Sequence, residues 1–324
     1  MKLTRKQKVG VVTFLVCGLV LSGTINVNAA QYITKEQTVN EEQAVIIQRT
    51  KKNNKQKKVS EKTRNKYFSD AAFVGNSVSV GLKMYFDSQG KGFLGAPTML
   101  VQGCYSFAND AAAHSQYQIS YKGKKYKAKD AIKAAKVKKA FISMGTNDMG
   151  KPASQVYQDY VKYIQGIRKE NPNVIIFIQS TTPMCTSKNR KYLNNSAINE
   201  LNKLMKKYCN KHKDMYYVDI SKDMKDKSGG LKKQYASDGY VHMTMAGYKV
   251  WTNNLTEYVD KLILQEQEAT NAVEKAAKSR IQEDYDAANT LVKKLASSQK
   301  KDQLKKKLGT IHIVDTADVA EDNS

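Results

Sequence analysis

Short apolar runs alternate with longer amphipathic stretches between residues 67 and 264. Five runs are typical of buried strands: AAFVG (71–75), TMLVQG (98–103), KKAFISMG (138–145), VIIFIQS (174–180) and MYYVDI (215–220). Helical stretches follow four of them, and after the third run a helical spacing separates Val156, Tyr160, Tyr163, Ile164 and Ile167. Strands followed by helices, in repeated order, predict an α/β domain with a mostly parallel five-stranded sheet that is covered on both faces.

A different pattern occupies residues 265–310. Steps of four, three, four and three residues, typical of an amphipathic helix, separate Ile281, Tyr285, Ala288, Val292 and Leu295. Leu304 and Leu308 suggest a further short helix after a break at Ser297–Ser298. We therefore expect a small helical hairpin or bundle here, followed by a flexible tail over residues 311–324.

The first 30 residues have the layout of a secretory signal peptide. The basic stretch MKLTRKQK precedes the apolar stretch VGVVTFLVCGLVLSG, and small residues near Ala29 and Ala30 offer a cleavage point. An uncleaved membrane anchor is the alternative. Residues 31–66 include RTKKNNKQKKVSEKTRNK, which has almost nothing to bury, so we expect a basic linker that is disordered or forms a frayed helix. The mature protein is expected to be secreted or held at the cell surface.

The chain is strongly basic, with 54 Lys and Arg against 30 Asp and Glu and a formal charge of +24. This excess is accounted for by a lysine-rich, soluble surface, and in an exported protein it also favours contact with anionic cell-wall polymers. No nucleic-acid recognition motif accompanies it, so we expect no nucleic-acid partner. The three cysteines beyond the signal, Cys104, Cys185 and Cys209, match neither a disulfide framework nor a zinc site, which leaves core thiols or one bridge open. No His/Glu cluster has metal-binding spacing, so we expect no metal.

Polar residues follow the predicted strands, at the sheet edge where parallel sheets carry their active sites. The first strand ends in GNS, so Ser77 lies at a strand-to-helix junction, either as a helix cap or as a nucleophile. QGC places Gly103 after the second strand, and MGTND places Asn147 after the third. The stretch SDGYVHMTMAGY adds His242, a base, and Asp238, an acid four residues earlier.

Taken in order, GNS, the glycine of QGC, GTND and D…H resemble the sequence blocks of the SGNH (GDSL-type) hydrolases over about residues 70–255. The resemblance implies a flavodoxin-like three-layer α/β/α sandwich and an esterase that needs no cofactor. It also implies that Ser77 is the nucleophile, His242 the general base and Asp238 the orienting carboxylate. By the same resemblance, the oxyanion hole consists of the Ser77 N–H, Gly103 and the Asn147 amide.

Two departures from the family pattern stand out. Asn76 precedes the serine where the family has aspartate, and Asp238 lies four residues before His242 instead of three. A local bulge would restore the contact between acid and base; Asp219, at the end of the fifth strand, is the reserve candidate. Asp148, next to Asn147, is expected to fix its loop through backbone hydrogen bonds rather than to act as an acid or base.

The favoured hypothesis is an exported, monomeric serine esterase. Its expected substrates are O-acetyl or other short acyl groups on carbohydrates or cell-wall polymers, with lipid esters also compatible with the resemblance. The alternative is a catalytically weakened cell-surface binding protein built on the same domain, which the two departures favour.

Overall fold

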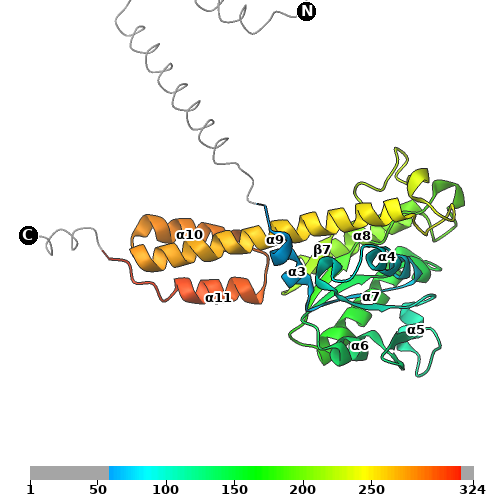
Figure 1. Cartoon of the computed structure of the whole chain (residues 1–324), viewed down its shortest axis with the longest axis horizontal. Coiled ribbons are helices and arrows are strands. Elements are labelled where there is room, and N and C mark those ends of the chain that lie inside the picture. Colours follow the sequence, from blue (N-terminus) through cyan, green and yellow to red (C-terminus); the bar gives the residue numbers. More distant parts are fainter. Residues whose placement is uncertain (1–57, 315–324) are drawn as a thin grey trace, which may run out of the picture. The chain divides into compact units, whose positions relative to one another are not determined.

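A five-stranded sheet lies at the centre of the computed structural model, which describes residues 58–314 (Figure 1). The strands are β1 (Ala71–Gly75), β2 (Thr98–Val101), β5 (Lys139–Ser143), β6 (Ile175–Gln179) and β7 (Met215–Val218). Their order in the sheet is β2-β1-β5-β6-β7, and every neighbouring pair is parallel. All five predicted strands are therefore confirmed. Their order is flavodoxin-like: β2 lies on one side of β1, and the later strands are added on the other side.

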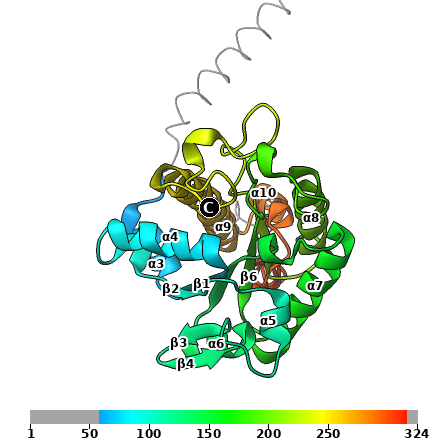
Figure 2. The same cartoon turned by 90° about the vertical axis from the view of Figure 1, so that its right-hand side faces the viewer.

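Helices cover both faces of this sheet (Figure 2). One face carries α3 (Glu61–Phe68), α4 (Ser77–Ser88) and the first part of α9 (Met245–Ser279). The other carries α5 (Phe107–Ala111), α6 (Ala128–Ala135), α7 (Ala153–Glu170) and α8 (Asn195–Cys209). Shorter elements connect them: the hairpin β3 (Ile119–Tyr121) and β4 (Lys124–Tyr126), and the 3₁₀ turns η1 (Phe93–Gly95), η2 (Thr146–Asp148), η3 (Thr186–Lys188) and η4 (Lys233–Tyr235). The three-layer prediction is confirmed.

Successive side chains of each strand point to opposite faces of the sheet, so the two faces have different apolar cores. On the α9 face, the rings of Phe73, Phe141, Phe177 and Tyr216 stack in a row across four strands, with centroids 5.1, 4.4 and 4.9 Å apart. The opposite face presents aliphatic residues such as Val74, Ile142 and Ile178 to α6, α7 and α8. Because both faces are covered, the strands read as nearly continuous apolar runs.

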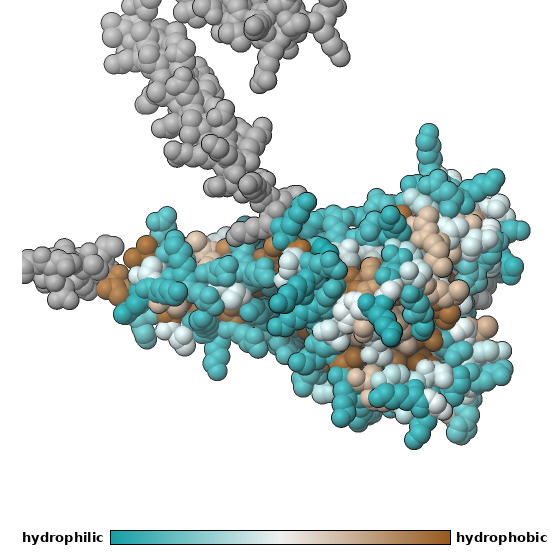
Figure 3. All heavy atoms as spheres, viewed as in Figure 1, coloured by the Kyte–Doolittle hydropathy of each residue, from teal (hydrophilic) through white to brown (hydrophobic). Residues whose placement is uncertain are grey.

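The C-terminal helices form a third apolar core. The helix α9 runs on past the sheet and packs against α10 (Gln282–Lys294) and α11 (Gln299–Leu308), burying Ala269, Val273, Ala288, Val292, Leu295, Leu304 and Leu308. On the face shown in Figure 3, hydrophilic side chains predominate over this unit. A helical unit is present, but one continuous helix crosses the boundary expected between residues 264 and 265. Ile281, at the start of the predicted stripe, is 37% exposed and lies before α10 begins.

The last part of the expected linker, residues 61–66, is also helical. Ser60 caps α3 by accepting the Thr63 N–H, Phe68 is fully buried at its end, and Arg64 pairs with Asp260 of α9. The helix thus has an apolar anchor and a carboxylate partner that the basic composition of this stretch does not reveal. The predicted signal peptide, the rest of the linker and the tail from residue 315 lie outside the described residues.

No helix within residues 58–314 combines the length and the apolar character of a membrane-spanning segment.

Candidate active site

Ser77 is the first residue of α4, directly after the turn that ends β1. The helix cap is its neighbour: the Asn76 Oδ1 accepts the Val78 N–H at 3.1 Å. A Cβ on Gly75 would lie 2.1 Å from the Ser79 Oγ and 2.7 Å from the Ser143 carbonyl oxygen, so only glycine allows this tight turn. Of the two interpretations of Ser77, the capping role therefore falls to Asn76, and the Ser77 hydroxyl is available for another contact.

That contact is with His242. The Ser77 hydroxyl lies 3.0 Å from the His242 Nε2, although 165 residues separate them in the chain. The approach depends on close packing of α4 against α9, where a Cβ on Gly81 would lie 1.9 Å from the Tyr248 Oη. The main chain of His242 is fixed as well, because its carbonyl oxygen accepts the Ser237 N–H at 3.0 Å.

Asp238 completes a continuous series of hydrogen bonds. Its Oδ2 lies 2.6 Å from the His242 Nδ1, while its Oδ1 accepts the main-chain N–H groups of Tyr240, Val241 and His242 at 2.8, 3.1 and 3.1 Å. Gly239, with φ of 64°, provides the left-handed turn around the carboxylate, so the four-residue spacing still brings acid and base together. Partial burial opposes ionisation of Asp238, but its bonds to the His242 ring and to the backbone N–H groups hold its pKa below the usual value.

The reserve acid occupies a different place. The Asp219 Oδ1 accepts the Ser221 N–H at 3.1 Å and the Ser221 hydroxyl at 2.9 Å, and it makes no hydrogen bond to His242. Its role in the structure is to hold the turn after β7.

Three hydrogen-bond donors come from the ends of the adjacent strands β1, β2 and β5. The Asn147 Nδ2 donates one hydrogen to the Tyr105 carbonyl at 2.9 Å, which leaves its second amide hydrogen for a ligand. Within residues 58–314, no acceptor is hydrogen-bonded to the main-chain N–H of Ser77 or of Gly103. Gly145, with φ of 111°, forms the turn that carries Asn147, and a Cβ there would lie 2.9 Å from Leu201.

The Asp148 carboxylate also fixes this loop. Its Oδ1 accepts the Phe107 N–H at 2.8 Å, so Asn147 and Asp148 tie the segment after Gly103 to η2 at two points. The expectation that Asp148 fixes its loop through backbone bonds is confirmed. Its Oδ2 is buried and has no hydrogen-bond partner. Burial raises the pKa of this carboxyl to about 7, although the Phe107 N–H favours the charged form.

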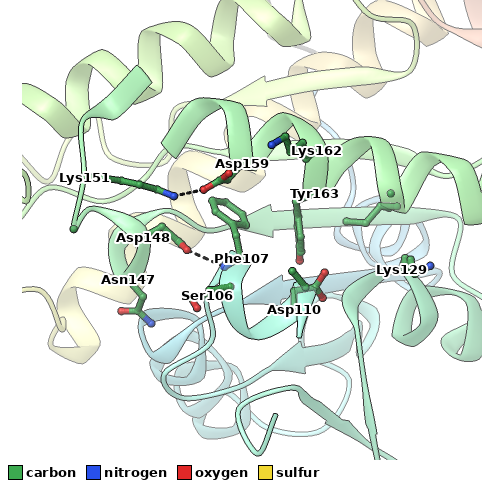
Figure 4. A pocket seen from close by; sticks show the side chains of 15 residues that line it. Ser106, Phe107, Asp110, Lys129, Asn147, Asp148, Lys151, Asp159, Lys162 and Tyr163 are labelled. Carbon is green, nitrogen blue, oxygen red and sulfur yellow. Dashed lines mark hydrogen bonds and ion pairs between the residues drawn. The ribbon is translucent and has the colours of Figure 1, made fainter. Parts of the chain in front are cut away.

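A cavity of about 570 Å³ lies beside Asn147, between α5, η2 and α7 (Figure 4). Phe107 and Tyr163 contribute apolar surface, and an ion pair between Lys151 and Asp159 lies at its rim. Its other polar lining residues include Ser106, Asp110, Lys129 and Lys162. Sequence reasoning missed these residues because they come from α5, α6, α7 and the loops beside them and, apart from those of GTND, belong to no motif.

Among the described residues, no group of three or more His, Cys, Asp or Glu side chains is arranged to hold a metal ion. All three cysteines of this part of the chain are free: Cys209 is buried, Cys185 half-buried and Cys104 exposed. The thiol of Cys209 belongs to the core, as expected, whereas the other two lie nearer the surface.

This arrangement is suited to acyl transfer. A serine hydroxyl bonded to an imidazole, which is bonded to a carboxylate, is the set of groups that activates a hydroxyl nucleophile. The free N–H donors around the start of α4 can hydrogen-bond to an oxyanion, and the positive end of the helix dipole would stabilise its negative charge. Ser77, Gly103 and Asn147 follow β1, β2 and β5, whereas Asp238 and His242 share the segment between η4 and α9.

A known protein family matches most of the region that carries this site. The profile of the GDSL-like lipase/acylhydrolase family matches residues 73–250, more than half of the chain. No curated protein matches the sequence.

Among solved structures, a carbohydrate esterase family 3 protein from Talaromyces cellulolyticus is 14% identical, with 60% of this chain and 97% of that chain covered and a TM-score of 0.43. A GDSL-like lipase from Bacteroides thetaiotaomicron is 15% identical, with coverage of 59% and 87% and a TM-score of 0.43. The lipase/acylhydrolase from Enterococcus faecalis is 12% identical, with coverage of 59% and 95% and a TM-score of 0.43.

Proposed function

Because the chain belongs to the GDSL-like lipase/acylhydrolase family and is therefore a hydrolase of ester bonds, we propose that it is an exported serine esterase with Ser77 as its nucleophile. The observation that carries this proposal is the series of hydrogen bonds from the Ser77 hydroxyl through His242 to Asp238. A serine that only capped a helix would need neither the imidazole nor the carboxylate behind it.

The proposed reaction has two halves. The Ser77 Oγ attacks the ester carbonyl while its proton passes to the His242 Nε2, and Asp238 stabilises the imidazolium that forms. The oxyanion is bound by the N–H groups of Ser77 and Gly103 and by the free amide hydrogen of Asn147. His242 then gives its proton to the departing alkoxide, and water activated by the same imidazole releases the acyl group from Ser77.

The proposed substrates carry O-acetyl or other short acyl groups on carbohydrates or cell-wall polymers. The side chains of His242 and Asp238 are 42% and 36% exposed, so a bulky carrier can approach the catalytic groups directly. The signal-like N-terminus and the excess of basic over acidic residues support contact with anionic polymers outside the cell. The proposed enzyme acts as a monomer.

The alternative of a weakened binding protein depended on two departures from the family pattern. Both have a structural explanation: Asn76 caps α4, as an aspartate would, and Asp238 reaches His242 despite the longer spacing. Neither departure therefore favours loss of activity.

The test is hydrolysis of phenyl acetate by the purified mature protein and by Ser77→Ala. Removal of a covalent nucleophile should lower kcat by roughly 10⁴- to 10⁶-fold. Ser79→Ala is the matched control, because Ser79 lies on the same helix, is 2% exposed and makes no hydrogen bond through its hydroxyl. Equal rates for wild type and Ser77→Ala, or an equal loss in both variants, would contradict the proposal. Labelling of Ser77 by an organophosphonate tests the nucleophile independently of the substrate.

A further inference from the structure

Three cations lie on the loop that connects β6 to α8, and this loop contacts the segment that carries the proposed catalytic histidine. This β6–α8 loop comprises residues 185–194, CTSKNRKYLN, and exposes Lys188, Arg190 and Lys191. The loop begins at the carboxyl ends of the strands, where Ser77 and Asn147 also lie, because β6 runs parallel to its neighbour β5. The proposed mechanism uses none of these three side chains.

The loop is held directly against the segment that carries Asp238 and His242. The Cys185 N–H donates to the Tyr240 carbonyl at 2.8 Å, and the Arg190 guanidinium lies 5.4 Å from the centre of the Tyr240 ring. Tyr240 is two residues from His242, and its own N–H bonds to Asp238. Arg190 therefore lies within reach of a substrate whose ester is at Ser77.

The shape of the loop is fixed by internal hydrogen bonds. Asn195 bonds to both the N–H and the carbonyl of Met184, at 3.0 and 2.9 Å, which fixes the start of the loop against α8. Further along, the Arg190 N–H donates to the Leu193 carbonyl at 2.8 Å, and the Asn194 amide donates to the Arg190 carbonyl at 3.0 Å. The cations therefore project from a structured loop.

No carboxylate within the described residues forms an ion pair with these cations, so their charges remain available to a ligand. The carboxylates nearest to the loop are already engaged. Asp226 accepts the N–H groups of Ser228 and Gly230, and Asp238 serves His242 and its own turn.

We propose that the β6–α8 loop is a cationic subsite for the carrier of the ester, and that this carrier is an anionic polyol or saccharide chain. The shared chemistry is a repeated negative group, either the carboxylate of a uronate or a phosphodiester, which Arg190 binds in bidentate fashion and the two lysines bind as point charges. This inference rests on the proposed esterase function and specifies, in addition, that the carrier of the ester is negatively charged. Cations at the rim of a catalytic site also raise the local concentration of an anionic substrate.

The experiment measures inhibition of phenyl acetate hydrolysis by three unacylated oligomers of equal length: oligogalacturonate, oligo(glycerol phosphate) and uncharged oligogalactose. At low ionic strength at least one anionic oligomer should inhibit competitively, with a Ki about tenfold below that of oligogalactose. The triple variant Lys188→Gln, Arg190→Gln, Lys191→Gln should lose this difference. Comparing the two anions identifies whether carboxylate or phosphodiester is preferred.

The matched control is Lys305→Gln, Lys306→Gln, Lys307→Gln, which removes the same charge from exposed lysines at the end of α11. It should keep the wild-type preference for the anionic oligomer. If neither anion inhibits better than oligogalactose, or if both triple variants lose the preference alike, the subsite does not exist. If wild type fails to hydrolyse phenyl acetate, the esterase proposal fails instead, and calorimetric titration of the same oligomers into the three proteins decides the subsite on its own.

Discussion

Replacing Asp148 by asparagine should change how the stability of the protein depends on pH. The wild-type carboxyl is half-buried, accepts one N–H from Phe107 through Oδ1, and leaves Oδ2 buried without a partner. Lys151 favours its charged form and Asp159 opposes it, and burial outweighs both, which raises its pKa to about 7 from 3.8. Asparagine has nearly the same shape and can still accept the Phe107 N–H, but it is never charged.

The direction of this pKa shift determines whether the folded state gains or loses stability as the pH rises. A carboxyl with a raised pKa in the folded state is protonated in both states below about pH 4, so there it behaves like the neutral asparagine. Between about pH 4 and 7 the unfolded chain loses the proton first, so the folded state becomes less stable as the pH rises. A shift of about three units at about 1.4 kcal/mol each corresponds to at most about 4 kcal/mol, fully developed above about pH 8.

The assay is urea unfolding of wild type and Asp148→Asn at pH values from 4 to 9. The variant should match wild type near pH 4 and exceed its free energy of unfolding by up to about 4 kcal/mol near pH 8. Asp223→Asn, at an exposed carboxyl outside the site, controls for the loss of one negative charge. A difference between Asp148→Asn and wild type that stays constant with pH, or grows toward low pH, would refute the reasoning.

Two further predictions concern the catalytic residues and their supports. Asn76→Ala should lower the free energy of unfolding by about 1 kcal/mol because it removes the cap of α4, whereas Asn76→Ser should retain most of it; equal urea midpoints for the alanine variant and wild type would contradict the capping role. Asp238→Asn should lower kcat for phenyl acetate by roughly 10³- to 10⁴-fold with little change in KM, because the His242 Nδ1–H loses its carboxylate acceptor. A loss of less than tenfold would mean that another group orients the imidazole.

The sheet was predictable because its central strands β1, β5 and β6 are buried on both faces and therefore form distinct apolar runs. The proximity of the candidate site residues was predictable for a related reason, since parallel strands bring their carboxyl ends to one side of the sheet. Long-range packing was not predictable in the same way. The length of α9 depends on apolar contacts with α10 and α11, and α3 depends on an ion pair between Arg64 and Asp260, 196 residues apart. The β6–α8 loop carries no motif, so its place beside Tyr240 emerges only from the fold.

The two departures from the family pattern can be judged by what each position must do physically. The residue before Ser77 must accept the Val78 N–H, and a side-chain amide oxygen does this as well as a carboxylate. The acid must reach the His242 Nδ1, and a glycine in a left-handed conformation makes this possible at a longer spacing. Because Asn76 is neutral and only 2% exposed, it also adds no second carboxylate beside the nucleophile. Among the described residues, Asp238 is then the one carboxylate hydrogen-bonded to the imidazole, so the charge that stabilises the imidazolium resides in a single side chain held by three backbone N–H groups.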